Sequence, residues 1–261
     1  MFELPLLNTV ILLSSGVRLK CNKFGTTSPT TNKFYSTKAS LPFSSPKVLS
    51  TKRIGPHSHE VLSILIGSLL GDGYMEKDGH GSRFCFYQKG AHIEYVLWLH
   101  RILLEHGYCR ENLPQIQSRI IRNGGEATTH YYCRFRTFTY SSFNWIHEGF
   151  YGKKGKVVPT FVEEYLSPMA LAIWIMDDGG WINNRGIKIG TNCFSLSEVK
   201  FLASILEKKY GLKVAIHSAG ATNQYIIYLP KSNLPILIPL IEPHMHPLFL
   251  YKLNLVKPNL P

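Results

Sequence analysis

The strongest constraint on the fold of this chain is an internal repeat, in which an apolar run ends in an acid followed by glycine. The first copy spans residues 62–73 and ends in Asp72-Gly73, and the second spans residues 168–180 and contains Asp178-Gly179. Each run is long enough for about three turns of helix, and glycine is a common helix terminator. An acid at a helix C-terminus opposes the helix dipole. Two such ends therefore indicate a functional requirement.

The parallel continues downstream of both acids. Each is followed by a strand-like run, a helix-like segment closed by glycine, two further strand-like runs, a short helix candidate and a lysine. In the first half these are 84–88, 93–106, 115–121, 131–139, 142–149 and Lys156, and in the second 187–192, 197–210, 213–218, 225–229, 234–241 and Lys252. The pattern predicts an α+β fold built as a tandem αββαββα repeat, with residues 55–159 in the first copy and 160–261 in the second.

Residues 1–54 have a different composition. Residues 1–59 carry eight Lys and Arg against the single acid Glu3, and they are rich in Ser and Thr without helical or strand periodicity. This composition is typical of an organelle transit peptide or of a poorly ordered leader. We expect the folded part to begin near Gly55-Pro56.

Composition narrows the class of protein. The 261 residues carry a net charge of +12, and 44% of them are hydrophobic, which is enough for a sizeable core. A basic globular chain commonly binds a polyanion, most often nucleic acid, although a solvated basic surface is the alternative. The five scattered cysteines contain no CxxC pair, which argues against a disulfide framework or a zinc ribbon. The apolar stretch near the start is too short to span a bilayer, so no membrane partner is expected.

The repeated acids suggest a metal site. Two apolar helices that pack together would bring Asp72 and Asp178 to one end of their seam, and Gly67 and Gly71 share a helix face that permits close approach. Carboxylates held this close favour a divalent cation such as Mg²⁺ between them. Such sites hydrolyse phosphodiesters. The alternative is a pair of ordinary core helices with exposed acidic ends.

The two motifs, LIGSLLGDG at 65–73 and LAIWIMDDG at 171–179, resemble those of single-chain LAGLIDADG homing endonucleases of the organellar, intron-encoded type. The resemblance covers residues 55–257. It implies two four-stranded antiparallel sheets that form a DNA-binding saddle, with the motif helices at the centre. It also implies Mg²⁺-dependent cleavage of both DNA strands with short 3′ overhangs, with Mn²⁺ able to substitute.

The resemblance also assigns roles by position. Asp72 and Asp178 would hold metal, Lys156 and Lys252 would lie near the scissile phosphates, and Gln88 and Asn192 would order water. Asp177, the residue before the metal-binding position, would not bind metal directly. Leu70 replaces the first acid of the consensus, and Ile173 and Asp177 stand where the first motif has Gly67 and Gly71, which makes the seam asymmetric.

Period-two alternation suggests faces that read DNA. One strand-like run would present Gln115, Gln117 and Arg119 opposite Ile116 and Ile120, and a second would present Tyr132, Arg134 and Arg136. Arg and Gln form bidentate pairs with guanine and adenine. The second half offers a sparser set, which consists of Lys188, Asn223, Gln224, Tyr228 and Asn192.

Three functions fit this reading. The first is a site-specific endonuclease that acts as a monomer on double-stranded DNA and promotes intron homing. The second is a maturase that binds its host intron RNA, alone or in addition. The third is a non-catalytic DNA-binding regulator, for which loss of one acid would be expected. Asp72 and Asp178 are both present, which favours the nuclease. The family type suggests a mitochondrion, with a plastid as the alternative.

Overall fold

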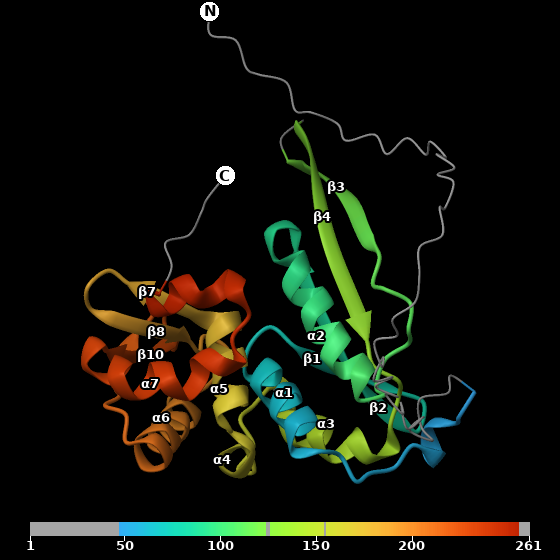
Figure 1. The fold of residues 1–261 in the computed structure, drawn as a ribbon, viewed down its shortest axis with the longest axis horizontal. Helices are drawn as coiled ribbons and strands as arrows, with labels where there is room; N and C mark the ends of the chain where they lie inside the picture. Colours follow the sequence, from blue (N-terminus) through green and yellow to red (C-terminus); the bar gives the residue numbers. More distant parts are fainter. Residues whose placement is uncertain (1–46, 124–125, 154, 256–261) are drawn as a thin grey trace, which may run out of the picture. The chain divides into compact units, whose positions relative to one another are not determined.

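The computed structural model describes residues 47–123, 126–153 and 155–255 (Figure 1). The first half contains η1 and the repeat that follows it: η1 (Ser50–Lys52), α1 (His59–Leu70), β1 (Tyr74–Asp78), β2 (Gly81–Lys89), η2 (Gly90–His92), α2 (Ile93–Glu105), β3 (Ile116–Asn123), β4 (Glu126–Arg136), η3 (Ser141–Phe143), α3 (Asn144–Phe150), β5 (Tyr151–Gly152) and β6 (Gly155–Lys156). Strands β1–β4 form an antiparallel sheet in the order β1-β2-β4-β3.

The second half repeats this order with shorter strands. Its elements are α4 (Val162–Tyr165), α5 (Pro168–Asp178), β7 (Gly179–Ile182), β8 (Gly186–Gly190), α6 (Leu196–Tyr210), β9 (Ala215–Ser218), β10 (Tyr225–Pro230), η4 (Lys231–Asn233), α7 (Leu234–Ile241), η5 (Glu242–His244) and η6 (Pro247–Leu253). Its sheet order, β7-β8-β10-β9, matches that of the first sheet. The predicted tandem α+β fold with two antiparallel sheets is confirmed.

Helices α1 and α5 pack against each other and form the seam between the repeats. Each starts at a serine N-cap, because Ser58 accepts a hydrogen bond from the Val61 N–H and Ser167 accepts one from the Ala170 N–H. Both are buried around most of their circumference, as expected of a core helix. A Cβ on Gly67 would lie 2.4 Å from the Ala170 carbonyl oxygen, so glycine is required for this close approach.

Two larger helices cover the inner faces of the sheets. In the first repeat α2 packs on β2 and β4, and Phe84, Phe86 and Phe135 are buried there. In the second repeat α6 packs on β9 and β10. Ser195 and Glu198 form a capping box at its start, and Gly211 ends it in the left-handed conformation. The predicted glycine terminators of these two helices are confirmed.

Sequence periodicity did not locate β1 and β7, the first strand of each repeat. β1 has the sequence YMEKD and β7 has GGWI, and neither shows a clear alternation of apolar and polar residues. The β3–β4 hairpin also extends beyond the core. Ile116 and Ile120 are 59% and 64% exposed there, although they lie on the same face as the buried Cys133.

Packing begins before the expected boundary at Gly55. Arg53 is buried, its Nη1 donates a hydrogen bond to the Thr139 carbonyl, and its guanidinium lies over the Phe138 ring. Its carbonyl accepts hydrogen bonds from the hydroxyls of Ser141 and Ser142. The segment around Arg53 therefore belongs to the first repeat. The remainder of the expected leader, residues 1–46, lies outside the described residues.

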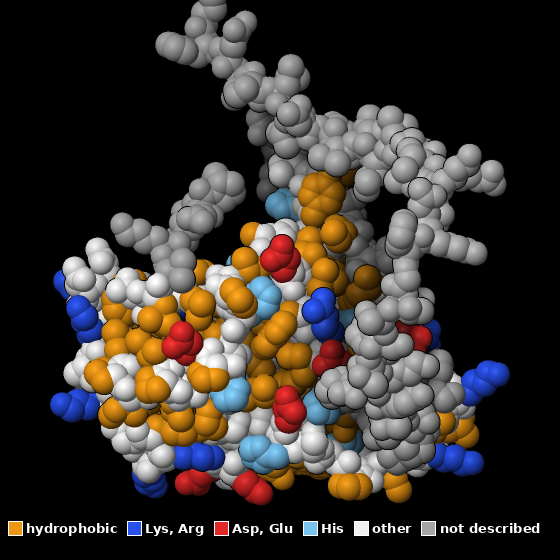
Figure 2. All heavy atoms as spheres, in the orientation of Figure 1, with side chains coloured by type: hydrophobic (Ala, Val, Ile, Leu, Met, Phe, Trp, Pro, Cys, Tyr) orange, Lys and Arg blue, Asp and Glu red, His pale blue; other side chains and the backbone are white. Residues whose placement is uncertain are grey.

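The surface carries mixed charge on the face seen in Figure 2. Lys and Arg side chains lie mainly toward its edges, and hydrophobic, acidic and histidine side chains lie between them. No helix in the described part of the chain is long and apolar enough to cross a membrane.

Candidate catalytic centre and nucleic-acid interface

The two acids lie at the C-terminal ends of the packed helices. Asp72 follows the last residue of α1 by two positions and is exposed, whereas Asp178 is the last residue of α5 and is half-buried. The seam thus brings the two predicted metal ligands into one electrostatic environment, since the charge of Asp72 acts on Asp178.

Each helix end is capped by the predicted lysine of its repeat. Lys156 Nζ donates hydrogen bonds to the carbonyls of Gly71 and Gly73, at 2.9 and 3.1 Å. Lys252 is buried, and its Nζ donates to the carbonyls of Ile175, Met176 and Asp177. A cation at a helix C-terminus offsets the helix dipole that the acids oppose. The lysines therefore offset the unfavourable interaction between the acids and the helix dipoles, and they keep positive charge next to both carboxylates.

The pKa of Asp178 is raised to about 7, chiefly because burial disfavours its charged form and secondly because of Asp72. Lys156 and Lys252 act in the opposite direction. Burial also lowers the pKa of both lysines, and the surrounding acids oppose this effect. A divalent cation bound between the acids would favour the ionised form of Asp178.

Asp177 crosses the seam to the other motif. Its Oδ2 accepts a hydrogen bond from the Asp72 N–H at 3.2 Å, and its Oδ1 accepts one from the Tyr95 hydroxyl at 2.9 Å. Burial, followed by the charge of Asp72, raises the pKa of Asp177 well above its ordinary value. Both carboxylate oxygens thus accept hydrogen bonds from protein donors. That Asp177 does not bind metal directly stays a prediction.

Gln88 contacts the centre, whereas Asn192 does not. Gln88 Nε2 donates to Asp72 Oδ2 at 2.5 Å. A groove of about 720 Å³ opens beside this contact and is lined by Asp72, Tyr87, Gln88, Lys89, Gly90, Ala91, His92, Thr129, His130 and Tyr131. Gln88 pairs with Cys133 in the first sheet, and Thr191 faces Tyr225 at the corresponding place in the second.

The structure therefore does not place Asn192 at the position equivalent to Gln88. Thr191 is the counterpart of Gln88 by register, and its hydroxyl donates to the Tyr225 carbonyl. Asn192 lies exposed in the turn after β8. Repeat offsets alone could not show this, because the two halves differ in strand length.

The donor chemistry of the centre fits a hard divalent cation. Among the described residues, no three His, Cys, Asp or Glu side chains gather as metal ligands. Two carboxylates, supplemented by waters and phosphate oxygens of a substrate, are how Mg²⁺ is commonly bound, because it retains several waters. Asp72 and Asp178 are the residues that would hold it.

The first sheet gathers most of the predicted readout residues on one face. Gln117 pairs directly with Tyr132, Arg119 pairs with His130, and Arg134 pairs with Tyr87. Directly paired residues in an antiparallel sheet share a face, and this is the face opposite the buried Phe84 and Phe86. Gln115 precedes β3, and its Nε2 donates to the Leu113 carbonyl. The alternation is confirmed for the strand residues, and their base contacts stay a prediction.

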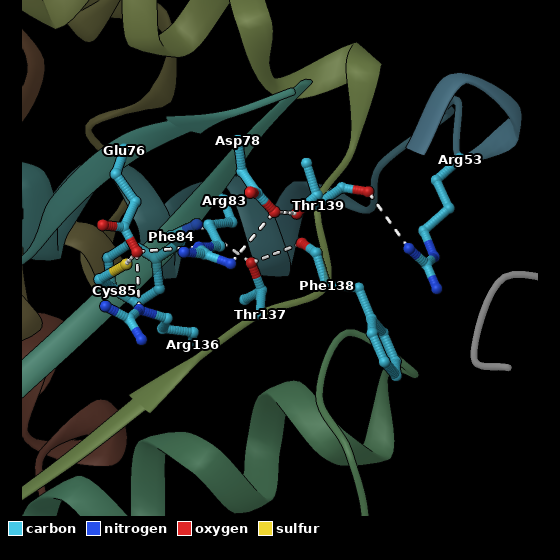
Figure 3. A network of polar contacts seen from close by, with 10 residues as sticks. All are labelled: Arg53, Glu76, Asp78, Arg83, Phe84, Cys85, Arg136, Thr137, Phe138 and Thr139. Atoms are coloured by element: carbon cyan, nitrogen blue, oxygen red, sulfur yellow. Dashed lines mark hydrogen bonds and ion pairs between the residues drawn. The ribbon is translucent and has the colours of Figure 1, made fainter. Parts of the chain in front are cut away.

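Arg136 lies on the same face within a network of ion pairs (Figure 3). Its Nε contacts Glu76 Oε1 at 2.6 Å, and Arg83 Nε contacts the same oxygen at 2.8 Å. Arg83 Nη1 also reaches Asp78 Oδ2 at 3.1 Å, and that oxygen accepts a hydrogen bond from the Thr139 hydroxyl. Burial acts to raise the pKa of Glu76, but hydrogen bonds from Cys85 and Arg83 and the arginine charges outweigh it, so the pKa is lowered.

The second sheet offers fewer readout residues than the first. Lys188 and Tyr228 are directly paired and share a face, and the Tyr228 hydroxyl donates to the Arg185 carbonyl. Asn223 and Gln224 lie instead in the turn between β9 and β10, where Asn223 adopts a positive φ of 59°. These two were expected to contribute to the readout set, and the structure places them at a loop.

Sequence reasoning did not single out Tyr95, Glu76 or Thr191. Tyr95 lies in an amphipathic helix, where an aromatic residue reads as core, and its hydroxyl contact to Asp177 depends on the seam. Glu76 lies in a strand that the sequence pattern did not locate. A repeat alignment based on strand register would have found Thr191.

Two packed helices, each with an acid and a capping lysine at its C-terminal end and each followed by a four-stranded antiparallel sheet with polar residues on one face, define the class of two-repeat homing endonucleases. The chain belongs to the LAGLIDADG DNA endonuclease family, which matches residues 62–237.

Known relatives and a solved structure agree with this assignment. The chain is 44% identical over 201 residues to the cytochrome b mRNA maturase bI2 of Debaryomyces hansenii, covering 76% of this chain and 75% of the relative. It is 40% identical over 152 residues to the intron-encoded endonuclease ai4 of Dictyostelium discoideum, covering 58% of this chain and 95% of that one. The structure of the homing endonuclease I-WcaI bound to its DNA recognition sequence matches with a TM-score of 0.67 and 25% identity, covering 85% of this chain and 98% of that chain.

Proposed function

We propose that this protein is a Mg²⁺-dependent homing endonuclease, with Mn²⁺ able to substitute, that cuts both strands of a long asymmetric DNA target and leaves short 3′ overhangs. The observation that carries the proposal is the pair of helix ends at the seam. Each presents an acid, Asp72 or Asp178, next to a lysine whose Nζ binds backbone carbonyls at the C-terminal end of that helix or directly after it.

The residues of the centre have distinct roles in this proposal. Ionised Asp72 and Asp178 would hold the cation, and Gln88 would orient the Asp72 carboxylate through its hydrogen bond. Lys156 and Lys252 would offset the charge of the scissile phosphates. A bound divalent cation supplies Lewis-acid activation of the phosphate and a nucleophilic water at neutral pH. Asn192 has no contact here that supports the water-ordering role.

Target recognition would use the open sheet faces of a single chain. The first face offers Gln117, Arg119, Tyr132 and Arg134, and the second offers Lys188 and Tyr228. One chain contains both motif helices, so a monomer would suffice. The unequal faces predict an asymmetric target. Residues 55–159 and 160–261 would act as the two half-site modules.

The test of this proposal is direct cleavage of the unoccupied insertion site. The protein is incubated with the intronless form of the gene whose intron encodes it, in Mg²⁺, and both new ends are mapped. A single double-strand break with short 3′ overhangs at the insertion site is the expected result. Intact DNA under conditions in which the protein binds that site would contradict it.

The second candidate function is an RNA maturase. Two relatives that are 44% and 43% identical are named cytochrome b mRNA maturase bI2, from Debaryomyces hansenii and Saccharomyces cerevisiae. By this resemblance the host intron RNA would be a further partner, and an organelle, most simply a mitochondrion, would be the location. Splicing of the host intron in vitro, with and without the protein, distinguishes this function from DNA cleavage.

A further inference from the structure

The two metal-binding acids leave their helices differently. Asp178 is the last residue of α5, so its N–H remains in the helical hydrogen-bond ladder. Helix α1 ends at Leu70, and Gly71 turns out of the helical conformation with φ −105° and ψ −128°. The N–H of Asp72 is therefore outside the helix, and it donates instead to Asp177 Oδ2, a side chain of the opposite motif.

The space for this contact exists because of Gly71. A Cβ at that position would lie 2.5 Å from the Asp177 Cβ and 2.7 Å from its Oδ2. The other oxygen of Asp177 accepts the hydroxyl of the buried Tyr95, so the carboxylate is held from both sides. Gly71 occupies the position in the first motif that Asp177 occupies in the second. Because glycine has no side chain, the first motif cannot reach Asp178 in the same way. The bridge exists in one direction only.

We infer that Asp177 is a positioning residue that fixes Asp72 across the seam, and that Asp178 has no equivalent support. This inference rests on the proposed nuclease function, and it deepens it by making the two half-sites mechanically unequal. A misplacement of a reacting group by about 1 Å can cost about a hundredfold in rate. Loss of the bridge should therefore slow cleavage of one DNA strand more than that of the other.

The experiment uses a supercoiled plasmid with one target, so that nicked circles report single-strand cleavage and linear DNA reports both cuts. Asp177→Ala removes both accepting oxygens, and we expect one strand to be cut about tenfold more slowly while the other changes less than about twofold. Nicked circles should accumulate. Binding of the target in Ca²⁺ should stay within about threefold of wild type, because the readout faces are unchanged.

Conservative variants separate positioning from folding. Asp177→Asn keeps an oxygen for the Asp72 N–H, and its amide can donate to the Tyr95 oxygen, so it should restore near wild-type strand ratios. Tyr95→Phe removes one of the two anchors and should slow the same strand as Asp177→Ala. Tyr210→Phe is the matched control. It also removes a tyrosine hydroxyl bonded to protein, but this hydroxyl donates to the Leu166 carbonyl, at the opposite end of α5 from Asp177. It should cut like wild type.

Amide hydrogen exchange tests the bridge independently of cleavage. In Asp177→Ala the Asp72 amide should exchange at least about tenfold faster, while the Asp178 amide is unchanged. If Asp177→Ala does not fold, Tyr95→Phe provides the same comparison. Unchanged Asp72 exchange, or equal slowing of both strands by folded variants, would overturn the inference. Failure of the wild type to cut DNA would refute the proposed nuclease, and the exchange result would still decide whether Asp177 holds Asp72.

Discussion

At the residue scale, the protonation state of Asp178 depends on its burial and on the charges around it. Its pKa of about 7 lies above the ordinary value of 3.8 for aspartate, because of burial and the nearby Asp72. A group whose pKa rises on folding stabilises the protein at low pH, and this contribution is lost as the pH rises from about 4 through 7. A divalent cation needs the ionised form and would counter the loss.

We therefore predict that the metal-free protein loses about 1 kcal/mol of stability between pH 5 and pH 8, about half of the linkage expected over that range because Asp178 is partly exposed. Urea unfolding in EDTA across this range measures the effect. Asp178→Asn should flatten the profile, and Mg²⁺ should restore stability mainly above pH 7. A stability that rises with pH in the metal-free wild type, and equally in Asp178→Asn, would exclude this role of the carboxyl group.

Glu76 neutralises part of the positive charge on the first sheet face. It pairs with both Arg83 and Arg136, so its removal should free the Arg136 guanidinium for a phosphate contact, while Arg83 keeps its ion pair with Asp78. Glu76→Ala should bind non-specific DNA more tightly and steepen the dependence of log K on log salt by about one. Glu148→Ala is the control. Glu148 lies on helix α3 and pairs with Lys77, so this variant also removes one paired acid. Equal steepening in both variants would indicate only a change in net charge.

At the scale of elements, the seam between α1 and α5 depends on small residues. A Cβ on Gly67 would lie 2.4 Å from the Ala170 carbonyl oxygen and 2.9 Å from its Cα, both backbone atoms that cannot turn away. We predict that Gly67→Ala destabilises the protein by about 2–4 kcal/mol. Gly152→Ala should be nearly neutral, since its Cβ would meet Val157 at 3.4 Å, an ordinary contact. Denaturant unfolding of both variants tests this, and equal stabilities would contradict the packing argument.

The sequence was most informative where a pattern is local and repeated. The motif helices, their glycine ends and the glycine-terminated α2 and α6 follow from periodicity and termination signals. The sequence pattern did not locate strands β1 and β7, because neither alternates apolar and polar residues as a strand with one buried face does. The partners of Asp177 were not predictable, because Tyr95 and Asp72 meet it only when two distant segments pack.

At the scale of the whole molecule, the boundary of the folded part lies earlier than Gly55. Arg53 packs over Phe138 and its backbone carbonyl binds two hydroxyls. We predict that a chain of residues 55–261 is about 1–2 kcal/mol less stable than a chain of residues 47–261. Both should still cleave DNA, because the centre starts at Asp72. Thermal unfolding of the two truncated chains makes the comparison, and equal stability would place Arg53 outside the folded unit.

We propose that Asp72 and Asp178 jointly hold the metal with which the protein cuts DNA. The most direct measurement compares wild type with Asp72→Asn and Asp178→Asn in parallel cleavage and gel-shift assays, in Mg²⁺ and in Ca²⁺. Each substitution nearly keeps size and removes one charge, so each should abolish double-strand cleavage while specific DNA binding is retained. Binding at low metal should be equal or tighter, because carboxylate–phosphate repulsion is relieved. Full cleavage by both variants would contradict the account, and loss of binding together with loss of folding would make the two acids structural.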